Sequence, residues 1–216
     1  MYQKTLGIVL SKEIIKEADK LLSIYTQDLG KVHAIAKGAA KISAKLLSGT
    51  EPVTETEFMF YIRPGNYSFV KIVGGELKNM FFDIKNDREK YFYSCCVVEL
   101  VNLLTADFDK NPEKYNLIKR ALDLLCKTKN PKRIYIAFSL RFLKLCGYKF
   151  IDTTNKNQEC LRKIVSVSGD EIDDLDIPVD IEKMLITSIE RYISDLLKID
   201  KPLKTLQLSF LLSEGD

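Results

Sequence analysis

The hydrophobic pattern of this chain changes its period once, and that change constrains the fold more than any other feature. Up to about residue 77, apolar and polar residues alternate, as in TLGIVL and EFMFYI, which predicts β-strands. After Gly74-Gly75, apolar residues recur at helical spacing. We therefore predict an all-β domain, residues 1–79, followed by an all-α domain, residues 80–216.

The β region is expected to form a small closed barrel. Five short strands are predicted in about 75 residues, with one helical turn in SAKLLSG near the middle. The sequence RPGN at 63–66 predicts a turn between the last two strands. This arrangement favours a barrel of the OB type, which leaves no strand edge unpaired. A small open sheet packed against the helices is the alternative.

One predicted hairpin, residues 19–45, carries most of the candidate binding residues. Its two runs, LLSIYT and KVHAIA, are joined by the polar loop QDLG. Alternation in the second run places Val32, Ala34 and Ala36 on one face. The opposite face and the loop after it hold a row of cationic or titratable side chains: Lys31, His33, Lys37, Lys41 and Lys45. A solvated strand face also explains this row, so the context must decide.

Charge is distributed unevenly along the chain. The first 80 residues hold 11 Lys and Arg against 8 Asp and Glu, whereas the remaining residues hold 22 of each sign. The basic excess therefore lies in the β region, where it would suit a phosphate backbone. Gly38, directly after Lys37, would let a bound strand approach the backbone closely, and Tyr25 is a candidate stacking residue.

The α region is predicted to contain four long helices. The first covers residues 86–105, and the second begins at Asn111-Pro112. The third begins with Asn130 as N-cap and Pro131 as first residue, and ends at Gly147. The fourth lies around residues 181–196. Residues 148–178 are expected to be polar and irregular, and the apolar tail 203–212 is expected to dock on the helices.

The third helix has one basic face on an otherwise apolar surface. Arg133, Arg141 and Lys144 share this face with Ala137. Cations beside apolar surface suit an acidic peptide that ends in an apolar anchor. The alternative is that these cations pair with nearby carboxylates or lie against the helix end.

Residues for catalysis or metal binding are scarce. His33 is the one histidine, and no phosphate loop, GxGxxG or GxSxG motif occurs. The five cysteines lack paired spacing, so we expect reduced, mostly buried thiols and no zinc. The acidic run from Asp170 to Asp176 lacks the spacing of an EF-hand and predicts a solvated loop. We therefore expect no enzyme activity, no metal and no cofactor.

The hydropathy pattern argues against a membrane or secretory segment. The most apolar stretch, residues 91–108, is interrupted by Glu99, Asn102 and Asp107, and the N-terminus lacks the pattern of a cleaved signal peptide. The composition is that of a soluble globular protein, which we expect to be cytoplasmic.

Several motifs, in order, resemble the family of the bacterial recombination mediator RecO. They begin with TLGIVL, the strand DKLL ending in Tyr25-Thr26, the turn residue Gly30, and AKGAAK at 36–41. They continue with Ser43, Glu51-Pro52 and a hairpin. FSLRFLKLCGY at 138–148 is similar to that family's F-x-L-R-x-L-x-x-x-G-[YF] helix, and YISDLLKIDKPLKTLQLSFL to its closing helix and tail. The resemblance covers nearly the whole chain.

The resemblance implies an N-terminal OB fold that binds single- and double-stranded DNA, followed by a helical domain. It implies a mediator that anneals complementary strands and, with RecR, helps load RecA onto strands coated by single-stranded-DNA-binding protein (SSB). The helical domain would receive the acidic tail of SSB. Many members hold zinc in a four-cysteine hairpin after the Gly-[YF] motif. Here Thr154, Asn157, Ser166 and Ser168 stand in that region, so a degenerate hairpin without zinc is expected.

Three hypotheses follow. The first is a nucleoid-associated DNA-binding mediator that uses Tyr25, Lys31, His33, Lys37, Gly38, Lys41 and Lys45 for DNA, and Arg133, Arg141 and Lys144 for the SSB tail. The second is an adaptor whose OB barrel binds a protein and not nucleic acid. The third, an enzyme acting on nucleic acid, lacks the carboxylate, histidine or metal cluster that such chemistry needs.

Overall fold

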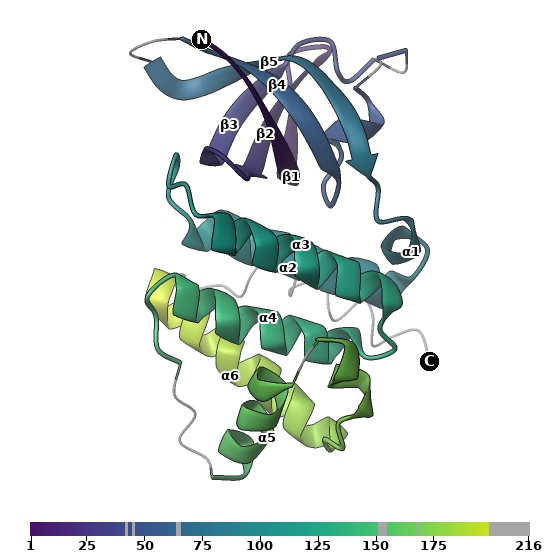
Figure 1. The fold of residues 1–216 in the computed structure, drawn as a ribbon, viewed down its shortest axis with the longest axis vertical. Coiled ribbons are helices and arrows are strands. Elements are labelled where there is room, and N and C mark those ends of the chain that lie inside the picture. The colour runs from purple at the N-terminus through teal and green to yellow at the C-terminus, as the bar shows by residue number, and fades with distance from the viewer. Residues whose placement is uncertain (42, 45, 64–65, 151–154, 168, 199–216) are drawn as a thin grey trace.

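The computed structural model describes residues 1–41, 43–44, 46–63, 66–150, 155–167 and 169–198. Figure 1 shows a β-barrel at one end of an elongated molecule. A layer formed by helices α2 and α3 lies against the barrel, and α4, α5 and α6 lie beyond it. The predicted order, strands first and helices second, is confirmed.

The barrel is closed and has five strands in the order β1-β2-β3-β5-β4. These strands are β1 (Tyr2–Ile15), β2 (Asp19–Thr26), β3 (Gly30–Ala36), β4 (Glu55–Arg63) and β5 (Asn66–Asn79). Strands β3 and β5 pair in parallel, and every other pair is antiparallel. The short helix η1 (Ser48–Thr50) lies between β3 and β4. This is the predicted OB-type barrel, and it excludes the open sheet.

Alternating residues of the five strands fill the barrel. The buried cluster inside it includes Val9, Leu22, Ile24, Val32, Ala34, Ala36, Phe58, Phe60, Ile62, Val70 and Ile72. Strand β1 is apolar on both faces, because Ile8 and Leu10 belong instead to the cluster formed with the helices. The barrel interior and the helical core are therefore two separate clusters, and strand β1 contributes residues to both.

The helical part begins directly after the barrel. Its elements are α1 (Phe82–Lys85), α2 (Arg88–Leu104), α3 (Pro112–Lys127), α4 (Pro131–Leu145), α5 (Asn155–Ser166), η2 (Gly169–Asp174) and α6 (Val179–Leu197). Asp87 caps α2 by accepting hydrogen bonds from the backbone of Glu89 and Lys90. Asn111 caps α3 in the same way, through Lys114. The four predicted long helices are confirmed.

The stretch predicted to be irregular, 148–178, differs from that expectation. It contains helix α5 and the 3-10 helix η2, which replace the expected hairpin. Cys160, Leu161 and Ile164 give α5 a short apolar face, but the polar residues around them mask this signal. Residues 151–154 and the predicted docking tail, 203–212, lie outside the described residues.

The acidic run is not simply a solvated loop. The Asp173 carboxylate accepts hydrogen bonds from the Thr128 hydroxyl (2.5 Å) and from the backbone N–H groups of Lys129 and Asn130 (3.0 and 3.1 Å). Partial burial alone would raise the pKa of Asp173, but these hydrogen bonds lower it below its usual value. Asn130 occupies the predicted N-cap position, and its side-chain amide donates to Asp173 as well.

Candidate nucleic-acid interface and peptide pocket

The predicted hairpin is present and has a three-residue loop. Strands β2 and β3 pair antiparallel from Lys20 opposite Ala36 to Thr26 opposite Gly30. The Thr26 hydroxyl accepts from the backbone of Leu29 at 3.0 Å and donates to the Gly30 carbonyl at 2.9 Å. Gly30 has a φ of 73°, a backbone conformation that residues other than glycine rarely adopt.

The tip of this hairpin is docked on the connection between α2 and α3. The Lys31 ammonium donates to the carbonyl oxygen of Asn102 at 2.9 Å and lies 3.5 Å from the Asp107 carboxylate. The Phe108 N–H donates to the Lys31 carbonyl at 2.8 Å. A Cβ atom on Gly30 would lie 2.3 Å from the Asp109 carbonyl oxygen. The tip is therefore part of the junction with the helices.

Burial separates the predicted DNA-binding residues into two groups. Lys31 is only 8% exposed, and Tyr25 is fully buried, so neither offers a surface to DNA in this structure. Burial raises the pKa of Tyr25 far above its usual range. His33 is half-buried, with Nδ1 3.0 Å from the Ser23 hydroxyl and Nε2 3.3 Å from Asp107. These three residues lie at the junction between the barrel and the helices, and they do not form an open row of cations.

The other group lies at the far end of the hairpin. Lys37 and Lys41 are exposed, and within the described residues neither has an ion pair. Gly38, between them, has a φ of 66°, and no atom of the described residues lies within 4 Å of the position that its Cβ would occupy. Its N–H donates to the Asp19 carboxylate at 2.8 Å, which fixes the turn. Lys45 lies outside the described residues.

One further cation near this end did not stand out in the sequence. Lys16 is exposed in the turn between β1 and β2, with a φ of 55°. This turn contacts the loop after β3, where the Ala40 N–H donates to the Ala18 carbonyl at 3.0 Å. The pairing of the two loops could not be inferred from the sequence, because 22 positions separate Ala18 from Ala40. We name Lys16, Lys37, Gly38 and Lys41 the cationic end of the barrel.

The predicted basic face of α4 is largely structural. Arg133 is 9% exposed, and its guanidinium lies 2.5 Å from Glu182 and 2.6 Å from the Leu175 carbonyl oxygen. Arg141 donates to the carbonyl oxygens of Val165 and Val167 at 3.0 and 2.9 Å. Burial lowers the pKa of Arg141. Both arginines therefore hold η2, α5 and α6 against α4. For Arg133, the ion pair with Glu182 agrees with the alternative interpretation, in which these cations pair with carboxylates.

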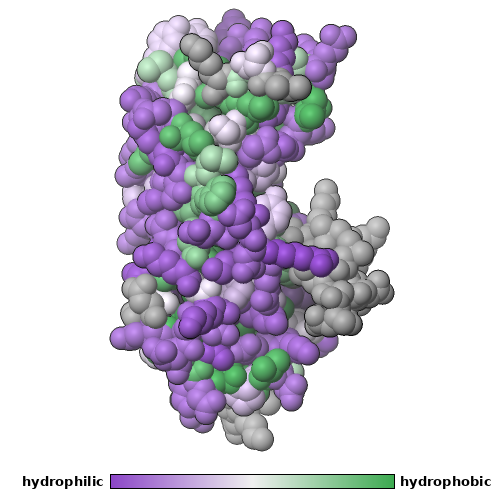
Figure 2. Space-filling view, turned by 90° about the vertical axis from the view of Figure 1, so that its right-hand side faces the viewer, coloured by the Kyte–Doolittle hydropathy of each residue, from purple (hydrophilic) through white to green (hydrophobic). Residues whose placement is uncertain are grey.

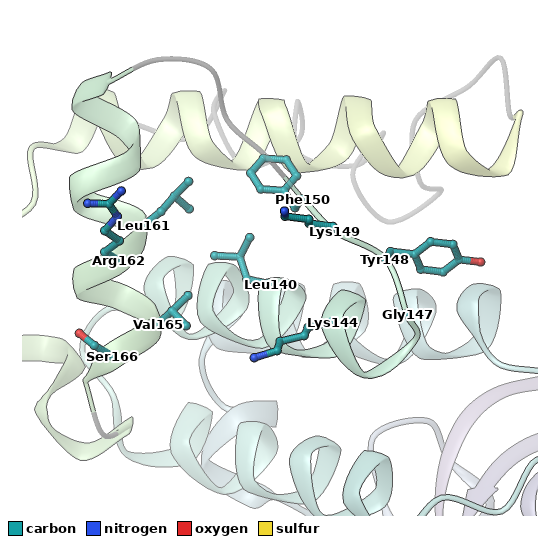
Figure 3. A pocket seen from close by; sticks show the side chains of 10 residues that line it. All are labelled: Leu140, Lys144, Gly147, Tyr148, Lys149, Phe150, Leu161, Arg162, Val165 and Ser166. Carbon is teal, nitrogen blue, oxygen red and sulfur yellow. The ribbon is translucent and has the colours of Figure 1, made fainter.

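Lys144, the third residue of that face, is exposed and borders a pocket of about 780 Å³. The pocket lies between the end of α4, the segment after it, and α5 (Figure 3). Leu140, Leu161 and Val165 give it an apolar lining. Three cations, Lys144, Lys149 and Arg162, stand at its border. Sequence reasoning missed this pocket because α5 was expected to be irregular.

No cluster of three or more histidine, cysteine or acidic residues is placed to hold a metal ion among residues that the structure describes. Over the same residues, no helix combines the length and hydrophobicity needed to span a bilayer. All five cysteines are free thiols.

Comparison with known proteins gives one consistent result. Residues 1–81 match the family model described as Recombination protein O N terminal, and residues 85–151 match Recombination protein O C terminal. Three proteins named DNA repair protein RecO are similar to this chain. The one from Alkaliphilus metalliredigens is 31% identical over 150 residues, which is 69% of this chain and 60% of that protein.

The other two show the same coverage. The protein from Acetivibrio thermocellus is 30% identical over 148 residues, 68% of this chain and 58% of that protein. The protein from Clostridium perfringens is 32% identical over 143 residues, 66% of this chain and 57% of that protein. The matched part of the chain thus spans 57–60% of the length of these relatives.

Proposed function

The chain belongs to the RecO family of DNA repair proteins, and we propose that it acts as a recombination mediator that binds DNA and catalyses no reaction of its own. The observation that carries the proposal is the cationic end of the barrel. Lys37 and Lys41 are exposed and lack ion pairs within the described residues, and Gly38 between them leaves open space above the backbone. Such a site can contact phosphates closely.

The cationic end suits DNA of either form. Phosphate contacts supply most of the affinity of sequence-independent binding and apply equally to single and double strands. Affinity should therefore fall steeply as salt rises and depend little on sequence. The residues at the hairpin tip, Tyr25, Lys31 and His33, are left out of this interface because they line the junction with the helices.

We further propose that the pocket beside α5 receives the acidic tail of SSB. An apolar lining bordered by Lys144, Lys149 and Arg162 suits a peptide that combines carboxylates with an apolar end. Arg141 would act indirectly, because it holds α5, which forms one wall of the pocket. Arg133 instead holds η2 and α6, which do not line the pocket. Together, a DNA site on the barrel and a peptide site on the helices suit a protein that acts on SSB-coated strands.

The remaining roles in the proposal come from the family. They are strand annealing, cooperation with RecR, loading of RecA, and a place in the cytoplasm near the nucleoid. The names of the relatives state DNA repair, which is the common element.

A titration of labelled single-stranded and duplex oligonucleotides, followed by fluorescence anisotropy, tests the proposal. We expect both to bind at low salt. A chain that binds neither form at low salt would instead favour the adaptor hypothesis, in which the barrel binds a protein.

A further inference from the structure

A second surface of the barrel combines an exposed and a half-buried tyrosine ring with exposed cations. In the sheet register, Leu21 lies opposite Ile35, Ile35 opposite Lys71, Lys71 opposite Tyr61, and Tyr61 opposite Tyr2. Strand neighbours of Leu21, Ile35, Lys71 and Tyr61 fill the barrel, so these four side chains face outward. The fifth, Tyr2, is 69% exposed and continues the row. Because the barrel is closed, this row runs around it, and Lys71, Tyr61 and Tyr2 lie on the three adjacent strands β5, β4 and β1.

The aromatic part of the row is a pair of tyrosines. Tyr2 is 69% exposed, and its ring centroid lies 5.2 Å from that of Tyr61, with the ring planes tilted by 55°. Met59 and Val73, both outward, extend the apolar surface and are 40% and 50% exposed. Single exposed apolar residues are common on proteins, and Figure 2 shows hydrophobic residues on the surface at the top of the view. Here, however, they adjoin one another on neighbouring strands.

Among the described residues, two cations of this face have no ion pair, whereas its carboxylate Glu57 is neutralised. Lys71 and Arg63 are exposed and form no ion pair in the described part of the chain. Glu57, the carboxylate nearest to the row on β4, is paired with Lys4 at 2.9 Å and Lys78 at 3.2 Å. These ion pairs lower the pKa of Glu57. The net charge around the tyrosines is therefore positive.

The row also connects with the cationic end. Lys37 directly follows Ala36, whose partner in β5 is Ile72, next to Lys71. Adjacent strands lie roughly 5 Å apart. Strand β4 separates β5, which holds Lys71, from β1, which holds Tyr2, so the backbones at Lys71 and Tyr2 are roughly 10 Å apart. One short segment of a nucleic-acid strand can therefore contact both the tyrosine rings and the cations.

We propose that the end of this row formed by Lys71, Tyr61 and Tyr2 is a stacking platform for single-stranded nucleic acid. Exposed rings stack unpaired bases regardless of sequence, and adjacent cations hold the phosphates. Duplex DNA keeps its bases stacked on one another and therefore gains only the contacts of the cationic end. This inference rests on the proposed DNA binding and adds to it a site selective for unpaired strands.

Replacement of both rings tests the platform. In Tyr2→Ala/Tyr61→Ala, affinity for a single-stranded oligonucleotide should fall at least about fivefold, the lower limit for loss of one base stack. Affinity for duplex of the same length should stay within about twofold. Tyr2→Phe/Tyr61→Phe keeps the rings and should restore single-strand affinity. Tyr91→Ala, which removes an exposed tyrosine of α2, is the matched control.

A photocross-link locates the contact directly. An oligonucleotide with 5-iodouracil should cross-link to Tyr2 or Tyr61 in the wild-type chain, as identified by mass spectrometry of the digest. Unchanged single-strand affinity in a folded Tyr2→Ala/Tyr61→Ala variant would overturn the platform while wild-type binding leaves the proposed function intact. Equal losses for single strand and duplex would also overturn it. A wild-type chain that binds neither form would overturn both proposals.

Discussion

The ammonium group of Lys31 in β3 donates a 2.9 Å hydrogen bond to the backbone carbonyl oxygen of Asn102 in α2. This bond joins the barrel to the helices across 71 positions of sequence. It also explains why a lysine on the polar face of a strand is nearly inaccessible. A position that looks like a DNA contact in the sequence is thus a structural contact between the two halves of the chain.

Replacement of Lys31 should destabilise the fold. Lys31→Ala leaves the Asn102 carbonyl without its donor at a mostly buried site, at a cost of about 1–3 kcal/mol in the free energy of unfolding. Lys37→Ala, which removes an exposed lysine directly after the same strand, should change the free energy of unfolding by less than about 0.5 kcal/mol. Urea denaturation followed by circular dichroism measures both. Equal losses in the two variants would contradict the junction role of Lys31.

The two glycines of the hairpin provide a matched pair. Gly30 and Gly38 both have positive φ, 73° and 66°. A Cβ at Gly30 would meet the backbone of Asp109 at 2.3 Å, whereas a Cβ at Gly38 meets nothing within 4 Å. Gly38→Ala should therefore cost only the conformational strain, about 1–2 kcal/mol. Gly30→Ala should cost clearly more or prevent folding, as thermal unfolding will measure. Similar melting temperatures would show that the hairpin tip is not docked.

Stability should depend on pH through Glu190 in α6. Burial raises the pKa of this carboxyl from 4.5 to about 7, so the folded state holds the proton more tightly than the unfolded state. The stability that the protonated Glu190 carboxyl contributes is complete below pH 4.5 and is lost as the pH rises to about 7. Glu190→Gln should therefore stabilise the chain by about 1 kcal/mol at pH 8, after allowance for partial exposure, and less at pH 5.

Denaturant titrations at pH 5 and pH 8 measure this difference. Glu113→Gln, which changes an exposed glutamate of α3, is the matched control. A stabilisation by Glu190→Gln that is larger at pH 5 than at pH 8 would contradict the assigned direction.

The pocket beside α5 should bind an acidic peptide with an apolar end. Lys144→Glu and Arg162→Glu place a like charge at its border, and each should weaken binding of an SSB tail peptide roughly fivefold at low salt. Lys127→Glu, an exposed position at the end of α3, is the charge-matched control. Anisotropy of a labelled peptide gives the affinities. Peptide binding in this pocket would be excluded if Lys127→Glu weakened the peptide affinity as much as the two border variants do.

Sequence pattern predicted the barrel and its strands because each element follows from local periodicity. The inward residues of β3, β4 and β5, such as Ala34, Phe60 and Ile72, are those that alternation selects. The helix starts at Pro112 and Pro131 follow equally from local cap signals. These features depend on a few neighbouring positions and so are visible in one sequence.

The burial and ion pairing of the candidate site residues could not be predicted from local periodicity in the same way. Tyr25 and Lys31 are buried by a connection that begins about 70 residues later, near Asn102. Arg133 is neutralised by Glu182, which lies 49 positions away. Whether a cation on a strand or helix is free depends on such distant partners, which periodicity does not reveal. Exposed loop residues such as Lys37 and Lys41 escape this difficulty because no later element in the described part of the chain covers them.

The central claim is that the cationic end of the barrel binds DNA, and a charge-reversal titration tests it most directly. Affinities of wild type and Lys37→Glu/Lys41→Glu for a labelled single-stranded oligonucleotide would be measured by anisotropy at two salt concentrations. We predict that the wild-type affinity falls steeply with salt, and that the double variant binds at least about tenfold more weakly at low salt with a shallower salt dependence. Unchanged affinity of the folded double variant at low salt would contradict the claim.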